Sequence, residues 1–160
     1  MDAAVDAAVD AAMDWISHVR AASADVEDWI RRVGPARWQM PFGKVWTNQD
    51  LLGHLAAWSD FLVDQVEALQ QDRPGEIKEV DVDAWNAAQV ASRRGRTADE
   101  IVEEWRRAVQ RATDVVGGLP ADAWRRHWPV AWSAKPVSID ALLRLWLGHL
   151  EQHRSRMASA

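Results

Sequence analysis

The chain of 160 residues contains no cysteine. This absence excludes disulfide bonds, thiolate metal ligands and a cysteine nucleophile. It is also consistent with a reducing compartment, and we expect a cytoplasmic protein. Tyrosine is absent too, whereas tryptophan occurs 11 times. Because tryptophan fills cores as readily as it lines apolar pockets, the count alone does not separate the two roles.

Long apolar runs and a dominant charge are also lacking. No apolar run approaches the ~20 residues of a membrane-spanning helix, and the acidic start "MDAAVDAAVDAAMDW" lacks the basic region of a secretory signal. The net charge is −5, and the arginine clusters near residues 93–96 and 106–111 are offset by neighbouring acids. We therefore expect a protein that binds neither a membrane nor a nucleic acid.

Strand-like alternation of useful length is missing, and helical spacing of apolar residues dominates instead. Capping residues mark the starts of the predicted helices: Asp2, Thr47 and Thr97, each of the two threonines with an acid three residues later, and Ser138. The stops are "GP" at 34–35, Gly95 and "GGLP". The predicted long helices cover residues 2–33, 48–71, 98–116 and 139–158.

A short helix is predicted within residues 82–94, and "ADAW" at 121–124 suggests one further helical turn. Residues 34–46 are predicted to be a loop. Residues 127–137 form a connector with two prolines. Some β-structure could be accommodated there, but we do not predict it. Four long helices with short connectors predict an all-α four-helix bundle, with an extra short helix between the second and third long helices. The length suits a single domain spanning residues 1–160.

The last predicted helix places two histidines on its apolar face. Steps of four, three, four and four residues connect Leu142, Trp146, His149, His153 and Met157. This spacing defines one inward face. The two imidazoles are one helical turn apart, close enough to bind one ion. They are candidate metal ligands.

His54 is the candidate third ligand, because it borders the apolar stripe of the second helix that includes Leu51, Leu55 and Trp58. Helical bundles build metal sites from side chains on facing helices. The alternative is that all three histidines are core residues with satisfied hydrogen bonds. His18 and His127 have no metal-like neighbours in sequence, and we expect surface or structural roles for them.

Two segments, "WTNQDLLGHLAAWSDFLVDQVEAL" and "LLRLWLGHLEQHRSRM", resemble the DinB/YfiT-like superfamily. That family is a four-helix bundle with one histidine early in its second helix and a His-x-x-x-His pair in the last. The resemblance implies a divalent ion, typically zinc or nickel, at His54, His149 and His153. It also implies a homodimer, and a family that includes transferases and isomerases using low-molecular-weight thiols.

The middle segment, "VDAWNAAQVASRRGRTADEIVEEWRRA", looks more like the ClbS/DfsB branch. The known activity of that branch is self-protection against a genotoxic metabolite, and it does not need the three histidines. The two parts of the resemblance therefore favour different functions.

Three hypotheses follow. The first is a metal-dependent enzyme, a thiol-dependent S-transferase or isomerase or a hydrolase, acting on a small electrophilic molecule; an ion held by neutral imidazoles lowers the pKa of a bound thiol or water. Asp50, Glu151 and Gln152 are candidates for orienting the imidazoles. The second is a metal-independent protein that binds a small molecule. The third is a structural or regulatory bundle. Pocket candidates are Trp46, Trp58, Trp85 and Trp146.

Overall fold

The computed structural model describes residues 3–74, 80–130 and 133–158. Four long helices lie side by side as a bundle: α1 (Ala3–Arg37), α2 (Asn48–Gln70), α4 (Ala98–Gly117) and α5 (Ile139–Met157). Helix α2 packs on α4 and α5, and α1 packs on the same two helices. The predicted all-α bundle is confirmed. Within the described ranges, no helix combines the length and apolar character of a membrane span.

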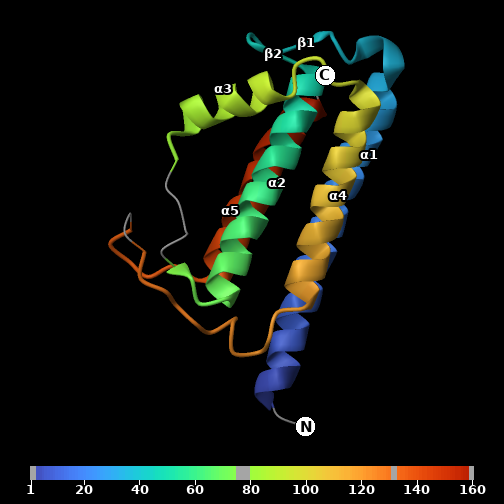
Figure 1. Ribbon diagram of the computed structural model, residues 1–160. Coiled ribbons are helices and arrows are strands. Elements are labelled where there is room, and N and C mark those ends of the chain that lie inside the picture. Colours follow the sequence, from blue (N-terminus) through green and yellow to red (C-terminus); the bar gives the residue numbers. More distant parts are fainter. Residues whose placement is uncertain (1–2, 75–79, 131–132, 159–160) are drawn as a thin grey trace.

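The predicted extra helix is α3 (Val82–Ser92), which leaves the bundle at an angle (Figure 1). It packs against α2 and has no buried residue of its own. The hairpin described below and the C-terminal end of α5 lie at the same end of the bundle as α3, whereas the chain begins at the opposite end. At this end the long helices are therefore joined by the short elements, the hairpin and α3.

Capping interactions fix where the helices begin. Thr47 and Thr97 each form a capping box with the acid three residues later, and the Ser138 side chain accepts from the amide of Ala141. In α1, Gly34 has a φ of +59°, which interrupts the helical geometry at the predicted "GP" stop before another turn follows. The proposed Asp2 cap lies outside the described residues.

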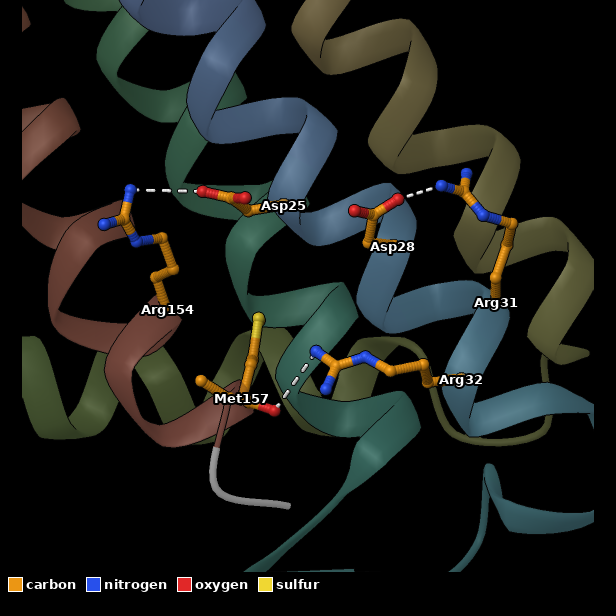
Figure 2. Close-up of a pocket in the computed structure, with 7 residues that line it drawn as sticks. Asp25, Asp28, Arg31, Arg32, Arg154 and Met157 are labelled. Carbon is orange, nitrogen blue, oxygen red and sulfur yellow. Dashed lines mark hydrogen bonds and ion pairs between the residues drawn. The ribbon is translucent and has the colours of Figure 1, made fainter.

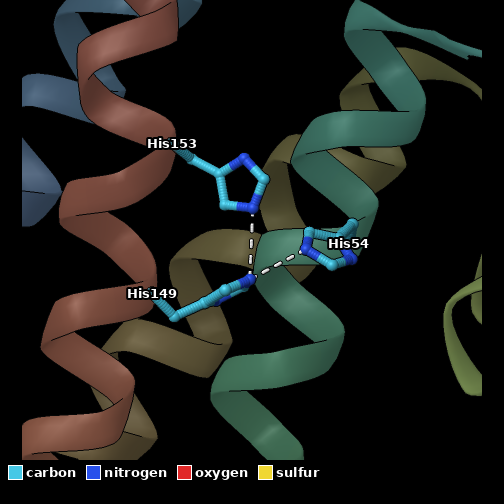
Figure 3. A group of neighbouring side chains, drawn as sticks. All are labelled: His54, His149 and His153. Atoms are coloured by element: carbon cyan, nitrogen blue, oxygen red, sulfur yellow. Dashed lines mark hydrogen bonds between the residues drawn. The ribbon is translucent and has the colours of Figure 1, made fainter. Parts of the chain in front are cut away.

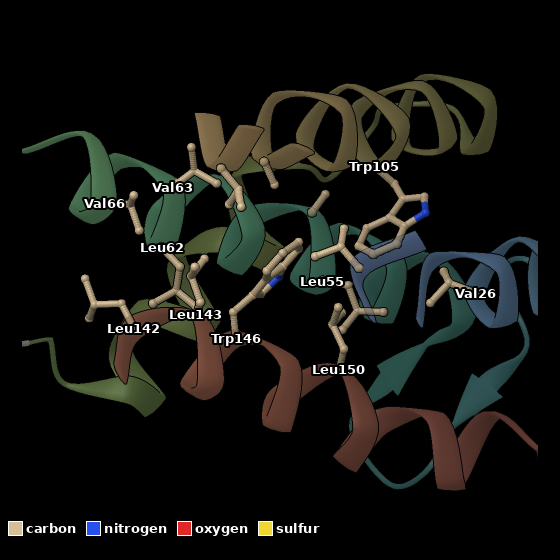
Figure 4. Packing of buried hydrophobic residues seen from close by; sticks show 14 of the residues in the cluster. Val26, Leu55, Leu62, Val63, Val66, Trp105, Leu142, Leu143, Trp146 and Leu150 are labelled. Atoms are coloured by element: carbon tan, nitrogen blue, oxygen red, sulfur yellow. The ribbon is translucent and has the colours of Figure 1, made fainter. Parts of the chain in front are cut away.

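The core lies between the four long helices (Figure 4). Three tryptophans, Trp29, Trp105 and Trp146, are among its largest fully buried side chains. The indole Nε1 of Trp146 donates to the Ser59 hydroxyl at 2.9 Å, which satisfies its one polar atom in an apolar environment. The aliphatic residues around it come from α2 and α5: Leu55, Leu62, Val63, Val66, Leu142, Leu143 and Leu150.

The prediction for the segment before α2 needs correction. The predicted loop before α2 contains a two-stranded hairpin, β1 (Pro41–Phe42) and β2 (Trp46–Thr47), paired antiparallel. Two-residue strands are too short to show alternation, and the hairpin depends on tertiary contacts such as Phe42 against Trp29. The "ADAW" segment forms hydrogen-bonded turns, in which the Ala123 amide donates to the Pro120 carbonyl at 3.0 Å and the Arg125 amide donates to the Asp122 carbonyl at 3.1 Å.

The connector at 127–137 contains an isolated antiparallel bridge between Trp128 and Val137, where no β-structure was predicted. Two backbone hydrogen bonds of 2.9 Å join these residues. Both side chains are buried, so packing on the bundle brings together positions that no local pattern connects.

Candidate metal centre

The three predicted histidines converge between α2 and α5 (Figure 3). The Nε2 atom of His54 lies 2.9 Å from Nε2 of His149, which lies 3.2 Å from Nε2 of His153. One ligand atom from each ring lies within 4.8 Å of the other two, so the group could hold a metal ion. His149 occupies the middle of the group, and one helical turn on α5 separates it from His153.

The nitrogen spacing fits a small ion. A tetrahedral ion with ligand distances of ~2.0–2.1 Å places its nitrogen ligands roughly 3.3 Å apart, near the two measured separations. Without an ion, the Nε2 atom of His149 offers either one N–H or one lone pair, so it can form a good hydrogen bond with only one of its two histidine neighbours. The donor set therefore fits a metal ion better than it fits an unassisted hydrogen-bond network.

Burial keeps the cluster neutral. It lowers the pKa of His54 to about 3, and repulsion from His149 and His153 adds to this effect. Burial, followed by repulsion from His153, lowers the pKa of His149 to about 4. Burial together with the positive charge of Arg156 lowers the pKa of His153 to about 4. At neutral pH all three rings are therefore in the deprotonated form that binds metals.

The outer nitrogens of the three rings lack protein partners. Each Nδ1 atom is buried and has no hydrogen-bond partner among the described groups. The carboxylate of Asp50 instead accepts from the amide of Thr47 at 2.9 Å, and Glu151 and Gln152 are exposed. The structure therefore does not place these three predicted orienting residues at the cluster.

Asn86 on α3 is a nearby polar group that the sequence did not single out. Its side chain tends to raise the pKa of His54, opposing burial, although no hydrogen bond of good geometry reaches the ring Nδ1. Its carboxamide oxygen accepts from Trp58 Nε1 at 2.9 Å. Nothing in the local pattern of α3 could reveal this role, because it depends on how α3 docks against α2.

Aromatic rings flank the histidines on two sides. The Trp46 ring lies 4.6 Å from His54 and stacks at 6.4 Å on His153. The Trp58 ring lies 5.5 Å from His149 and 4.5 Å from Trp85. Trp146 belongs to the core described above and makes no such ring contact. Of the four pocket candidates, Trp46 and Trp58 thus lie against the histidines, and Trp85 lies against Trp58.

A cavity of about 920 Å³ adjoins the cluster at the open end of the bundle. His153 and Trp46 lie in its wall, so a small molecule inside it would reach the edge of the cluster at His153. The remaining wall comes from the hairpin, from α2 and α3 and from the end of α5: Pro41, Phe42, Gly43, Lys44, Val45, Asp50, Asp83, Asn86, Ala87, Val90, Arg94, Ser155 and Arg156.

A second cavity, of about 470 Å³, lies between α1 and the end of α5 (Figure 2). Its charges are largely paired with one another: Arg154 with Asp25 at 3.1 Å, and Arg31 with Asp28. No histidine lines it. It therefore offers no chemistry comparable to that of the first cavity.

An ion-pair network anchors the end of α3 close to the cluster. Glu104 on α4 pairs with Arg93 and Arg96, each at 2.5 Å, and the side chains of Arg93 and Glu104 are largely buried. Arg93 passes so close to Gly53 that a Cβ atom there would lie 2.7 Å from its Cδ. Gly53 precedes His54 in α2, so the glycine permits the contact that holds α3 beside the site.

The other two histidines lie apart from the centre. The His18 side chain is 60% exposed and lies 3.7 Å from Asp14 on the same helix. His127 is exposed in the connector, where Nδ1 lies 3.1 Å from the Arg125 carbonyl. Both positions agree with the expected surface roles.

Comparison of the sequence with known proteins identifies the family of the chain. The sequence model of the DinB superfamily matches residues 1–157. No curated protein and no solved structure matches the chain. Because the family match covers nearly the full length, and the helices and histidines follow the arrangement that the resemblance implied, the chain belongs to the DinB superfamily.

Proposed function

We propose that this protein is a divalent-metal-dependent enzyme that acts on a small electrophilic molecule, as a thiol-dependent S-transferase or isomerase or as a hydrolase. The observation that carries the proposal is the convergence of three neutral imidazoles beside a cavity large enough for a small substrate. His54, His149 and His153 would hold the ion, and zinc or nickel suits their nitrogen donors.

The histidines, the tryptophans and the cavity would each have a separate role in this reaction. Three neutral histidines add no negative charge, so a bound ion keeps its full positive charge. Such an ion lowers the pKa of a bound thiol or water and yields a nucleophile near neutral pH. Trp46 and Trp58 would cover the sides of the cluster, and the cavity at His153 would admit the electrophile.

Turnover by the metal-loaded protein tests this proposal. Untagged protein reconstituted with zinc or nickel is mixed with an electrophile such as 1-chloro-2,4-dinitrobenzene, with and without a thiol such as glutathione or cysteine; aryl ester hydrolysis is assayed in parallel. We expect rates above the uncatalysed reaction that vanish in the metal-free protein and in His149→Ala. Identical rates in these three preparations would contradict the proposed metal-dependent activity.

A second candidate is a metal-independent binding or self-protection protein of the ClbS/DfsB type. The aromatic cluster of Trp58, Phe61 and Trp85 favours it, since their centroids lie 4.5–5.4 Å apart at the α2–α3 contact. An aromatic compound could stack on such a surface. Binding that quenches tryptophan fluorescence, and that survives both chelation and His149→Ala, would support this function over the enzyme.

A further inference from the structure

The large cavity has cations at its rim that the proposed chemistry leaves unused. Lys44 comes from the hairpin turn, Arg94 from the chain just after α3 and Arg156 from the last turn of α5. We call these three side chains the rim cations. All three are exposed, and they come from separate segments that only the folded chain brings to one cavity.

The rim cations have no counter-ion among the residues that the structure describes. None of them forms an ion pair or a side-chain hydrogen bond with another described residue. Elsewhere arginines are paired across elements, as Arg111 is with Asp64 at 2.5 Å and with Glu67 at 2.7 Å. The unpaired cations are therefore unusual, and they line the cavity whose wall includes His153.

The acidic residues of the same wall do not cancel this charge. Two carboxylates, those of Asp50 and Asp83, line the cavity together with the three rim cations. One Asp50 oxygen already accepts from the Thr47 amide at 2.9 Å, and Asp83 lies in the first turn of α3, where the helix dipole favours a negative charge. An ion at the histidines would make the cavity still more positive.

The apolar part of the wall lies alongside the charged part. Phe42 and Trp46 come from the hairpin, and Val90 comes from α3. A ligand that satisfies every part of this wall has an apolar or aromatic body and an anionic group. Arginine pairs with carboxylate and phosphate oxygens through two parallel hydrogen bonds.

We propose that the cavity binds a small molecule with an apolar body and a carboxylate or phosphate group, with the anionic group held by Lys44, Arg94 and Arg156. This inference deepens the proposed function and rests on it in taking the histidines as the reacting end of the cavity. The anion site itself needs no metal, so the two proposals can fail separately.

Calorimetric titration of the metal-free full chain in low-salt, phosphate-free buffer tests the inference. The probes are phenyl phosphate, benzoate and the neutral benzyl alcohol. We expect saturable binding of at least one anion, at least about tenfold tighter than the alcohol, as charge-assisted bonds to arginine allow. The tighter of the two anions identifies phosphate or carboxylate as the recognised group.

The double variant Arg94→Gln, Arg156→Gln should weaken anion binding by about tenfold or more. The single variant Lys44→Gln changes an exposed turn residue without side-chain partners and provides a second reading should the double variant misfold. Arg107→Gln removes the same charge from an exposed position on α4 outside the cavity, and it should bind as the parent does.

Equal affinity for the anions and the alcohol would overturn the inference, as would anion binding unchanged in both cavity variants, or no saturable binding of either anion. Zinc binding to the same preparations is measured separately. Anion binding without zinc binding would sustain this inference while removing the metal-dependent function, and the reverse result would do the opposite.

Discussion

His149 is the central residue of the candidate metal centre, because its Nε2 contacts the Nε2 atoms of both other histidines. Replacing a ligand should cost more than the 10–100-fold in metal affinity typical of outer-shell changes. We therefore expect His149→Ala to weaken zinc binding by more than about 100-fold, measured by competition with a chromophoric chelator. His18→Ala, on the surface of α1, is the matched control and should bind zinc as the parent does.

The same side chains should control the acid stability of the metal-free protein. In the unfolded chain a histidine has a pKa near 6.5, whereas folding lowers the pKa of His54 to about 3 and those of His149 and His153 to about 4. Between these values the unfolded state binds more protons, so the free energy of unfolding falls as the pH falls.

This loss begins near pH 6.5 and continues to about pH 4 for His149 and His153 and to about pH 3 for His54. Each histidine contributes a slope of up to about 1.4 kcal/mol per pH unit. Urea denaturation at a series of pH values measures it. The triple variant His54→Gln, His149→Gln, His153→Gln should lose that part of the slope. A parent and variant with the same pH dependence would show that burial does not suppress protonation here.

At the scale of elements, Gly53 on α2 leaves room for the Arg93 side chain at the end of α3. Gly53→Ala would place Cβ at 2.7 Å from the Arg93 Cδ, and Arg93 is held by Glu104. Despite the helix propensity gained, ~1 kcal/mol, overpacking should leave a net destabilisation of about 1–2 kcal/mol. Thermal unfolding measures this difference.

The double variant Gly53→Ala, Arg93→Ala identifies the cause. Removing the arginine removes the clash, so the alanine at position 53 should cost less in that background than in the parent. Equal costs in the two backgrounds would place the strain elsewhere. Gly148→Ala on α5, where a Cβ meets nothing within 4 Å, controls for the propensity change alone.

Helix α3 should also open more readily than the bundle. None of its residues is buried. Among the described residues, α2 is the only long helix with which α3 makes more than isolated contacts. Local opening costs little free energy where few apolar contacts break. Hydrogen exchange should therefore be faster for the amides of α3 than for those in the middle of α2 and α4. Equal protection in the three helices would contradict this expectation.

The elements also show which features the sequence could predict. Helical spacing on α2 and α5 was enough to bring His54, His149 and His153 together, because the inward face of each helix is a local property. The hairpin, Asn86 and the contact between Gly53 and Arg93 escaped prediction. Each depends on contacts between segments that are distant in sequence or too short for a pattern, and tertiary packing alone creates them.

At the scale of the whole molecule, the residues that stabilise the bundle and the cavity proposed to bind the substrate lie in different regions. Most of the buried core residues lie along the four long helices, whereas the cavity opens at the end that carries the hairpin and α3. The histidines lie where the two regions meet, since His54 is buried in α2 and His153 also lines the cavity. A rigid support beside an accessible cavity is the arrangement that a metal-dependent site needs.

The central claim is that the three histidines hold a metal ion, and elemental analysis tests it most directly. Untagged protein is purified without chelator and compared with the double variant His149→Ala, His153→Ala. We predict about one zinc or nickel ion per chain, lost in the variant while its helical circular dichroism remains. A parent without metal, even after reconstitution with zinc, nickel and manganese, would contradict the claim and leave the histidines as core residues.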